Sequence, residues 1–326
     1  MNSQLTKSPG KDSPQRKGSF NTPITPTSVE VSPIKKISDT KCPVMLAFSS
    51  KLGKHVAMKL FPFQDQLRVS KLYKNESRFA HLSHPNIVSI LGSKEHREIP
   101  YKETTIRVSY ILMDLAFCDF EEILPEIKGD EKLVRTYFLQ MIDGLKYLHS
   151  NEIAHLDLKL ANLLLGRDYL LKITDFESSF KNGDEAVFTV GNLLYAAPEL
   201  LNKECRDPFM ADMYSAGIIL FMFMFGFHPF EGFESDYNLH NLMFKDQNAF
   251  WETHEKIQGK KLVCSEEFKE LFAALVNDNV EERAIFDEIT NCDWAIGPVY
   301  SYKELCGLMK KKLQGKFTHV EITESL

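Results

Sequence analysis

The chain has 326 residues, of which 44% are hydrophobic and 26% charged, as is typical of a globular protein. This length allows one large two-lobed domain or two ordinary domains. The formal net charge of −6 argues against nucleic acid as the main partner. Six cysteines occur without a Cys-x-x-Cys spacing, which favours reduced thiols in a cytoplasmic protein over disulfides or a zinc site.

The N-terminus is polar and has no apolar core, so we expect no signal peptide. The most apolar run, residues 215–230, is interrupted by glycine, histidine and proline. Its uninterrupted part is shorter than the ~20 residues that span a bilayer. We therefore expect a buried core helix and no membrane partner.

Residues 1–33 are predicted to form a disordered tail, because they hold few large apolar residues that could offset the entropy cost of ordering. One interpretation is a solvated tail without further function. The other is a regulatory tail, with Ser19 in a basic context and Ser/Thr-Pro pairs suited to upstream proline-directed kinases. These pairs begin at Ser8, Ser13, Thr22, Thr25 and Ser32.

The next segment, to about residue 111, has mostly β-strand patterns. β-rich runs at 42–50 and 55–61 flank a hairpin-like connection, and further strands are expected at 86–91 and 106–115. Between them, residues 68–82 carry apolar side chains at the spacing of an amphipathic helix.

After Asp119 the pattern becomes mainly helical, beginning with apolar positions at helical spacing in residues 133–150. A β-rich first third followed by an α-rich remainder predicts two lobes of one α+β domain, with the lobes at about 34–115 and 116–296. In the C-terminal segment 297–326, residues 301–313 are expected to form a helix. It either packs on the large lobe or serves as a docking or autoinhibitory helix.

Chemically reactive side chains cluster in HLDLKLANLLL, residues 155–165, where Asp157, Lys159 and Asn162 lie within six residues. Asp175 follows after another buried strand, and Lys59 ends the strand run HVAMK. Together these groups could bind a metal-chelated polyphosphate and accept a hydroxyl proton. Taken singly, Asp157 and Asn162 could instead be loop residues that satisfy local backbone groups.

These residues belong to an ordered series of motifs, and with it the chain resembles the eukaryotic protein kinase family over about residues 35–296. Lys159, two residues after the aspartate, resembles the serine/threonine type. The matching segments are VAMK at 56–59, HPNIV at 84–88, HLDLKLAN at 155–162, DFE at 175–177, APE at 197–199, DMYSAG at 212–217 and Arg283.

The resemblance implies a two-lobed fold, ATP and Mg²⁺ as cofactors, and protein substrates. Asp157 would accept the proton of the substrate hydroxyl, Lys159 would stabilise the transferring phosphoryl group, and Asn162 and Asp175 would hold Mg²⁺. Lys59, held by a glutamate, would bind the α- and β-phosphates. The adenine would lie between Val44, Ala57 and Leu164, beside Met113 as gatekeeper and the hinge from Asp114 to Ala116. The resemblance also implies a buried Glu199–Arg283 ion pair and an Asp212 that anchors the loop backbone.

Two departures concern the nucleotide site. Where the family has three glycines that let the backbone approach the phosphates, this chain has Ile37, Asp39 and Cys42. The usual spacing before HPNIV also places Asn75, and not a glutamate, opposite Lys59. A one-residue deletion in the following turn would place Glu76 there instead, and we favour this alternative.

Three further departures lie near the catalytic residues. Leu156 replaces an arginine that binds a phosphate in many relatives, so we expect that Ser178, Ser179 and Thr189 are not an obligatory on-switch. Glu177 replaces a glycine and must point away from the phosphates or join a cation. Asn192 replaces a threonine that normally bridges the aspartate and lysine, and its amide could substitute in part.

Two hypotheses follow. The first is an active serine/threonine kinase, because all five acid, amide and cation positions are retained. The alternative is a pseudokinase, a non-catalytic scaffold or allosteric binding module, because the glycines are lost and Glu177 is present.

Overall fold

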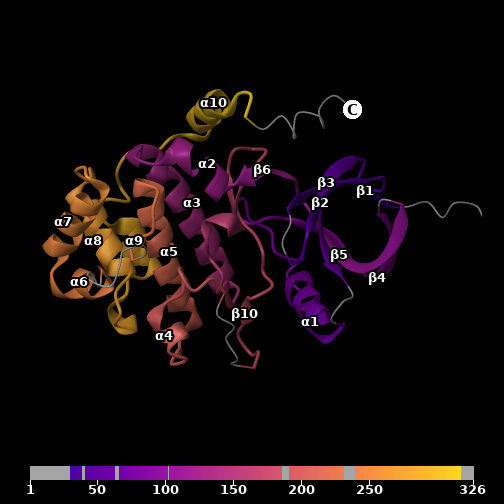
Figure 1. Ribbon diagram of the computed structural model, residues 1–326, viewed down its shortest axis with the longest axis horizontal. Coiled ribbons are helices and arrows are strands. Elements are labelled where there is room, and N and C mark those ends of the chain that lie inside the picture. Colours follow the sequence, from indigo (N-terminus) through magenta and orange to yellow (C-terminus); the bar gives the residue numbers. More distant parts are fainter. Residues whose placement is uncertain are drawn as a thin grey trace, which may run out of the picture.

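The structure, a computed structural model, describes residues 30–38, 41–62, 66–101, 103–185, 191–230 and 239–316. The chain forms a small β-rich lobe and a large, mainly helical lobe (Figure 1). The two-lobed α+β fold expected from the sequence is therefore confirmed. Most of the expected N-terminal tail lies outside the described residues, as do Asp39 and Thr189.

The small lobe is built on a five-stranded antiparallel sheet in the order β1-β2-β3-β5-β4. The first strand begins at Val31, three residues before residue 34, where the sequence placed the start of the folded domain. The strands are β1 (Val31–Ser38), β2 (Val44–Ser49), β3 (Lys54–Pro62), β4 (Ile90–Tyr101) and β5 (Thr104–Met113).

Alternation along β3 sends successive side chains to opposite faces of this sheet. Val56, Met58 and Leu60 join a core cluster on one face. Ala57 and Phe61 join a second cluster, which also contains residues of the helix α1 (Gln66–Ser77) and of the large lobe. Lys59, between Ala57 and Phe61, is consequently directed to the side where the two lobes meet.

The helix α1 ends at Ser77, directly after Glu76. The chain then continues in tight turns, in which Phe79 N donates to Glu76 O (3.2 Å), Ala80 N to Ser77 O (3.3 Å) and Leu82 N to Phe79 O (3.0 Å). These i to i+3 bonds take about 3.0 residues per turn, against 3.6 in an α-helix. The tightened turns explain how the chain reaches HPNIV with one residue fewer.

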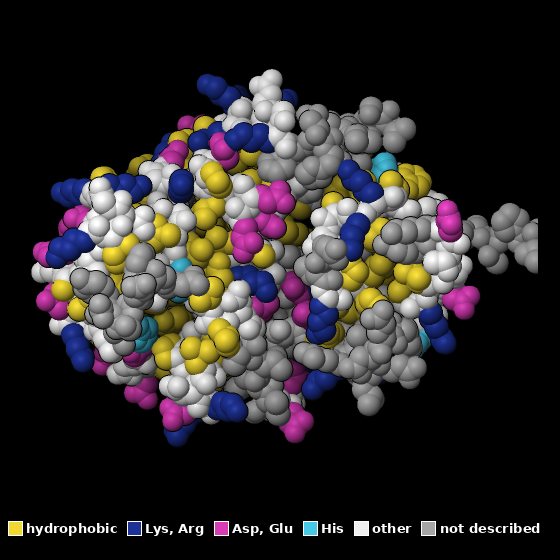
Figure 2. Space-filling model, viewed as in Figure 1, with side chains coloured by type: hydrophobic (Ala, Val, Ile, Leu, Met, Phe, Trp, Pro, Cys, Tyr) yellow, Lys and Arg dark blue, Asp and Glu magenta, His cyan; other side chains and the backbone are white. Residues whose placement is uncertain are grey.

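The large lobe surrounds two long, buried helices, α3 (Glu131–Ser150) and α5 (Pro208–Phe225). Short strands near the junction of the two lobes, where Figure 2 shows acidic and basic side chains close together, carry the loops of the candidate site. They are β6 (Ala116–Asp119), β7 (Ile153–Ala154), β8 (Leu163–Gly166), β9 (Leu171–Ile173) and β10 (Phe180–Lys181). The other helices are α2 (Phe120–Ile127), η1 (Leu160–Asn162), α4 (Pro198–Leu201), α6 (Leu239–Lys245), α7 (Gln247–Gln258), α8 (Glu266–Leu275), η2 (Val280–Glu282), α9 (Phe286–Asn291) and α10 (Tyr302–Leu313).

By length and composition, α5 is the one helix in the described part of the chain that could cross a membrane, and 78% of it is buried inside the fold. It begins at an Asp207 cap and ends at Gly226, whose φ of 82° lies in the left-handed region that suits glycine. Its burial agrees with the core helix that the sequence predicted over residues 215–230.

The C-terminal helix α10 packs on the large lobe. Its first turn is closed by a capping box between Ser301 and Glu304. Leu305, Met309 and Leu313 are buried in the large-lobe core, and Lys312 Nζ donates to Glu126 O on α2 at 2.8 Å. The packing agrees with the first of the two interpretations given for this helix.

Candidate active site

The loop before η1 is fixed by Asp212, which α5 presents to its backbone. The two carboxylate oxygens of Asp212 accept from His155 N at 2.7 Å and from Leu156 N at 2.8 Å. Leu156 has a φ of 62°, a left-handed conformation that costs an L-residue about 1–2 kcal/mol. The two hydrogen bonds to Asp212 hold this conformation, so Asp212 anchors the loop as expected.

The Asp157 carboxylate is the centre of this loop and is buried. Its Oδ2 accepts from Lys159 Nζ at 2.7 Å and from Asn162 Nδ2 at 3.0 Å. Its Oδ1 accepts from the backbone N–H of Asn192 at 2.9 Å. The Asn192 side chain instead accepts from Leu194 N at 3.0 Å. The expected substitution by the Asn192 amide is therefore made by its backbone, and the side chain closes a local turn.

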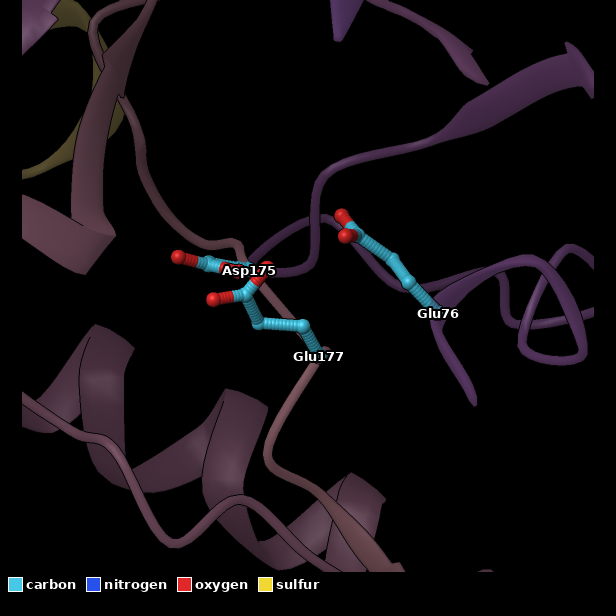
Figure 3. A group of neighbouring side chains, drawn as sticks. All are labelled: Glu76, Asp175 and Glu177. Carbon is cyan, nitrogen blue, oxygen red and sulfur yellow. The ribbon is translucent and has the colours of Figure 1, made fainter. Parts of the chain in front are cut away.

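Lys59 lies between carboxylates from both lobes. Its Nζ is 2.6 Å from Glu76 Oε2 and 2.6 Å from Asp175 Oδ1, and 3.7 Å from Glu177 Oε2. Figure 3 shows the three carboxylates converging from α1 and from the segment after β9. Burial alone would lower the pKa of Lys59, but the three negative charges outweigh it and raise the pKa. The cation held by this group is thus Lys59 itself.

The contact between Lys59 and Glu76 also decides which residue of α1 faces Lys59. Glu76 is completely buried beside Lys59, whereas the Asn75 amide donates to Glu177 O at 2.8 Å. Burial raises the pKa of Glu76 above its usual value, even though Lys59 acts to lower it. Glu76 Oε1 has no hydrogen-bond partner among the described residues.

Asp175 is placed by contacts on both sides of it. Ile173 N donates to Asn86 O at 2.8 Å and Thr174 N to Asn162 O at 3.0 Å, and the Phe176 ring packs against Phe79 at a centroid distance of 5.8 Å. Burial would raise the pKa of the Asp175 carboxyl, but Lys59 lowers it below its usual value. The carboxylate is therefore kept ionised.

Glu177 was expected to point away from the phosphates or to join a cation. Its carboxylate turns toward Lys59 and is mostly buried, with its side chain 22% exposed. The Glu177 charge consequently competes for the lysine that the resemblance assigns to the phosphates of ATP.

The residues expected to hold Mg²⁺ present suitable ligand atoms. Asn162 Nδ2 donates to Asp157 O at 2.7 Å as well as to Asp157 Oδ2, so its amide oxygen is the atom that could ligate a cation. The Asn162 backbone is joined to Thr174, the neighbour of Asp175. One amide oxygen and one ionised carboxylate fit Mg²⁺, a hard cation that takes oxygen ligands and keeps several waters.

The residues expected around the adenine lie together. Val44, Ala57, Met113 and Leu164 belong to one hydrophobic cluster with members in both lobes. In the expected hinge, Asp114 forms an ion pair with Lys54 at 2.8 Å. Ala116 begins β6 and is paired with Gly166.

Two of the three positions that replace the expected glycines can be placed. Ile37 lies on β1 and is exposed. Cys42 is buried in the same cluster as Ala57 and Met113, and burial raises the pKa of its thiol to about 12. The side chain of Cys42 thus occupies part of the space that a glycine at this position would leave open.

Sequence reasoning missed several residues that shape the site. Asn75 was considered only as an alternative to Glu76, although its amide contacts the segment after Asp175. Arg78 and Asp184 form an ion pair that no local spacing indicates, because 106 residues separate them. Gly191 could have been found from its position directly before Asn192, the residue that the motif pattern places near Asp157.

The expected ion pair between Glu199 and Arg283 is present as well. Arg283 NH1 and NH2 donate to the two carboxylate oxygens of Glu199, at 2.6 and 3.1 Å. Arg283 is buried and also donates to Asn277 O and Met210 O. This bidentate pair fixes α4 against the helical core.

Comparison with known proteins decides the family. The family model described as "Protein kinase domain" matches residues 40–295. The chain belongs to the protein kinase family. Among curated relatives, this kinase is 29% identical over 269 residues to CBL-interacting protein kinase 3 of Oryza sativa subsp. japonica, covering 77% of this chain and 54% of the relative.

Two further relatives carry serine/threonine kinase names. Serine/threonine-protein kinase chk-1 of Caenorhabditis elegans is 28% identical over 268 residues, 79% of this chain and 49% of the relative. The SNF-related serine/threonine-protein kinase of Homo sapiens is 28% identical over 281 residues, 80% of this chain and 34% of the relative. The chain thus spans about half or less of the length of these relatives.

Proposed function

We propose that this protein is an active serine/threonine kinase that transfers the γ-phosphoryl group of ATP to hydroxyl groups of protein substrates. The observation that carries the proposal is the joint assembly of the charged groups. Lys59 is held between Glu76 and Asp175, while Asp157 is bonded to Lys159 and Asn162. The serine/threonine names of the relatives agree with the proposed acceptor.

In the proposed reaction the substrate hydroxyl oxygen attacks the γ-phosphorus, and its proton passes to the Asp157 carboxylate as ADP leaves. Lys159, bonded to Asp157, would stabilise the charge of the phosphoryl group. Lys59 would bind the α- and β-phosphates. Asn162 and Asp175 would hold Mg²⁺, which neutralises phosphate charge when it is bound.

The second candidate is a pseudokinase. It is favoured by Glu177, whose carboxylate lies 3.7 Å from Lys59, and by Cys42, which is buried at a glycine position. Both features weaken the binding of a triphosphate. Neither disturbs the contacts of Asp157, so they act on nucleotide affinity and leave the phosphoryl-transfer groups in place.

The two candidates are separated by autophosphorylation of the purified protein with Mg·ATP. The test variant is Asp157→Ala, and the matched control is Asp287→Ala, whose side chain is 81% exposed on α9. We expect phosphate incorporation in the native protein and the control, and none in Asp157→Ala. Equal incorporation in all three proteins would reject catalysis by this site.

Thermal unfolding with ATP, with and without Mg²⁺, separates binding from turnover, because a ligand that binds the folded state raises Tm. A Mg²⁺-dependent rise in Tm without any phosphate incorporation would favour the pseudokinase.

A further inference from the structure

We propose that Asn75 and Arg78 are positioning residues that fasten α1 to the segment after Asp175, and so keep Glu76 and Asp175 on either side of Lys59. The effect on turnover rests on the kinase activity proposed above. The mechanical part of the proposal concerns the folded chain alone.

Asn75 makes the first connection. Its amide nitrogen carries two hydrogens, and it lies 2.8 Å from Glu177 O and 2.9 Å from Ser179 O, with Phe176 O at 3.4 Å. Asn75 and Glu76 are successive residues of one helix, so their side chains leave α1 in different directions. One faces the segment and the next faces Lys59. A shift of α1 that broke the Lys59–Glu76 contact would therefore also break the contacts of Asn75.

Arg78 makes the second connection, one turn after Asn75. Its NH1 and NH2 donate to the two carboxylate oxygens of Asp184, at 2.8 and 2.6 Å, and NH2 also lies 3.4 Å from Ser179 O. About a third of each side chain is exposed, so the pair adds little stability by itself. Its bidentate geometry does fix the orientation of the two segments.

The segment after Asp175, which Asn75 and Arg78 contact, is held by the large lobe. Strand β10 pairs with β7, Ser179 Oγ donates to His155 O at 3.3 Å, and Asn182 N donates to Glu152 O at 2.9 Å. Asn75 and Arg78 therefore join a helix of the small lobe to a segment that the large lobe already holds.

The contacts of Asn75 and Arg78 do not require a modified residue. The partners of Asn75 are backbone carbonyls, and the partner of Arg78 is the carboxylate of Asp184, whose pKa is lowered by the hydrogen bonds from Arg78. Leu156 offers no positive charge that a phosphate on the segment could use. The contacts that position α1 are thus encoded in the chain itself.

The proposal is tested with Asn75→Ala, Arg78→Glu, Asp184→Arg and the double variant Arg78→Glu/Asp184→Arg. Lys74→Ala is the matched control, because Lys74 is exposed on the same helix. The first readout is hydrogen exchange of residues 71–82 in the nucleotide-free protein, which requires no activity. The second is kcat and KM for ATP with a peptide substrate.

We expect at least tenfold faster exchange in α1 for Asn75→Ala and about threefold faster exchange for Arg78→Glu and for Asp184→Arg, because the ion pair is partly exposed. Exchange should be unchanged in Lys74→Ala and partly restored in the double variant. kcat should fall about tenfold in Asn75→Ala while the Tm of the protein changes little. Unchanged exchange in Asn75→Ala and Arg78→Glu, or a double variant that shows the sum of both defects, would overturn the proposal.

If neither the native protein nor any variant shows measurable turnover, the proposed function is rejected. The exchange results would still decide the role of Asn75 and Arg78. If Arg78→Glu does not fold, Arg78→Gln removes the ion pair without reversing the charge and is expected to give the same loosening of α1.

Discussion

Gly191 lies so close to Asp157 that a β-carbon added at position 191 would come within 2.1 Å of Asp157 Oδ1 and 2.6 Å of its Cγ. The next residue, Asn192, donates its backbone N–H to the same oxygen. The backbone at 191–192 thus approaches the carboxylate as closely as a chain without a side chain allows.

Replacing Gly191 by alanine should therefore displace Asp157. We expect Gly191→Ala to lower kcat at least 100-fold while the affinity for Mg·ATP changes little, because the clash lies at Asp157 and not at the adenine cluster. Steady-state kinetics and calorimetric titration with nucleotide measure the two effects. Gly307→Ala on α10 is the control, since its added carbon would meet nothing within 4 Å. A kcat near that of the control would contradict the prediction.

Removing the charge of Glu177 should strengthen nucleotide binding. Like charges about 4 Å apart repel by about 1 kcal/mol in water and ~4 kcal/mol at an effective dielectric of 20. We therefore expect Glu177→Gln to lower the Kd for Mg·ATP at least fivefold in a calorimetric titration. Glu252→Gln on α7, with a side chain 67% exposed, should leave the Kd unchanged. An unaltered Kd in Glu177→Gln would show that the carboxylate does not oppose the phosphates.

Phosphorylation of the segment after Asp175 should be dispensable for activity. Ser179 is buried, and its hydroxyl donates to His155 O. Leu156 replaces the arginine that would bind a phosphate group on this segment. We expect the triple variant Ser178→Ala/Ser179→Ala/Thr189→Ala to keep kcat within about threefold of the native value. Loss of activity in a variant with an unchanged Tm would refute this expectation.

The C-terminal helix should stabilise the large lobe and not restrain activity. Leu305 and Met309 are 1% and 0% exposed, and a buried leucine replaced by alanine typically costs 2–5 kcal/mol. We expect Leu305→Ala to lower Tm clearly, whereas Lys310→Ala on the exposed side of α10 has no effect. Truncation after Pro298 should also lower Tm. An increase in kcat after truncation would indicate an autoinhibitory helix instead.

His254 should make stability depend on pH. It is buried among aromatic rings, with Nε2 2.9 Å from Pro229 O, and burial lowers its pKa from 6.5 to about 4. The unfolded chain therefore binds a proton between pH 6.5 and 4 that the folded chain excludes, so this contribution is complete above pH 6.5 and is lost as the pH falls toward 4. At pH 5 the loss is about 2 kcal/mol, or a few degrees in Tm.

The measurement compares Tm at pH 7 and pH 5 in the native protein and in His254→Phe, which keeps an aromatic ring but cannot titrate. The variant should show the smaller decrease. Equal decreases in both proteins would assign the pH dependence to other groups.

The sequence predicted the two lobes and the main residues of the site because their signals are local. Alternation and helical spacing depend on near neighbours, and the motifs of Asp157 and Asp175 each occupy a few successive residues. The identity of the α1 glutamate does not follow from such local signals, because it depends on whether the turn after Ser77 is α-helical or tighter. The fixed spacing of a pattern does not carry that information.

Other features could not be predicted because they depend on packing between distant segments. The Arg78–Asp184 pair joins residues 106 positions apart, and the orientation of the Glu177 side chain follows from the position of Lys59. The role that the sequence suggested for the Asn192 side chain falls to its backbone for a related reason. Its backbone N–H already occupies the place beside Asp157, which the close approach of Gly191 makes possible.

Cys42 has a consequence for compounds directed at the nucleotide site. Its side chain lies in the hydrophobic cluster of Ala57 and Met113, where the family pattern has glycine and hence open space. An inhibitor shaped to fill that space would collide with the side chain of Cys42. An electrophilic warhead would gain little there, because a thiol with a pKa of about 12 stays protonated and weakly nucleophilic. This position therefore favours small, reversible ligands over bulky or covalent ones.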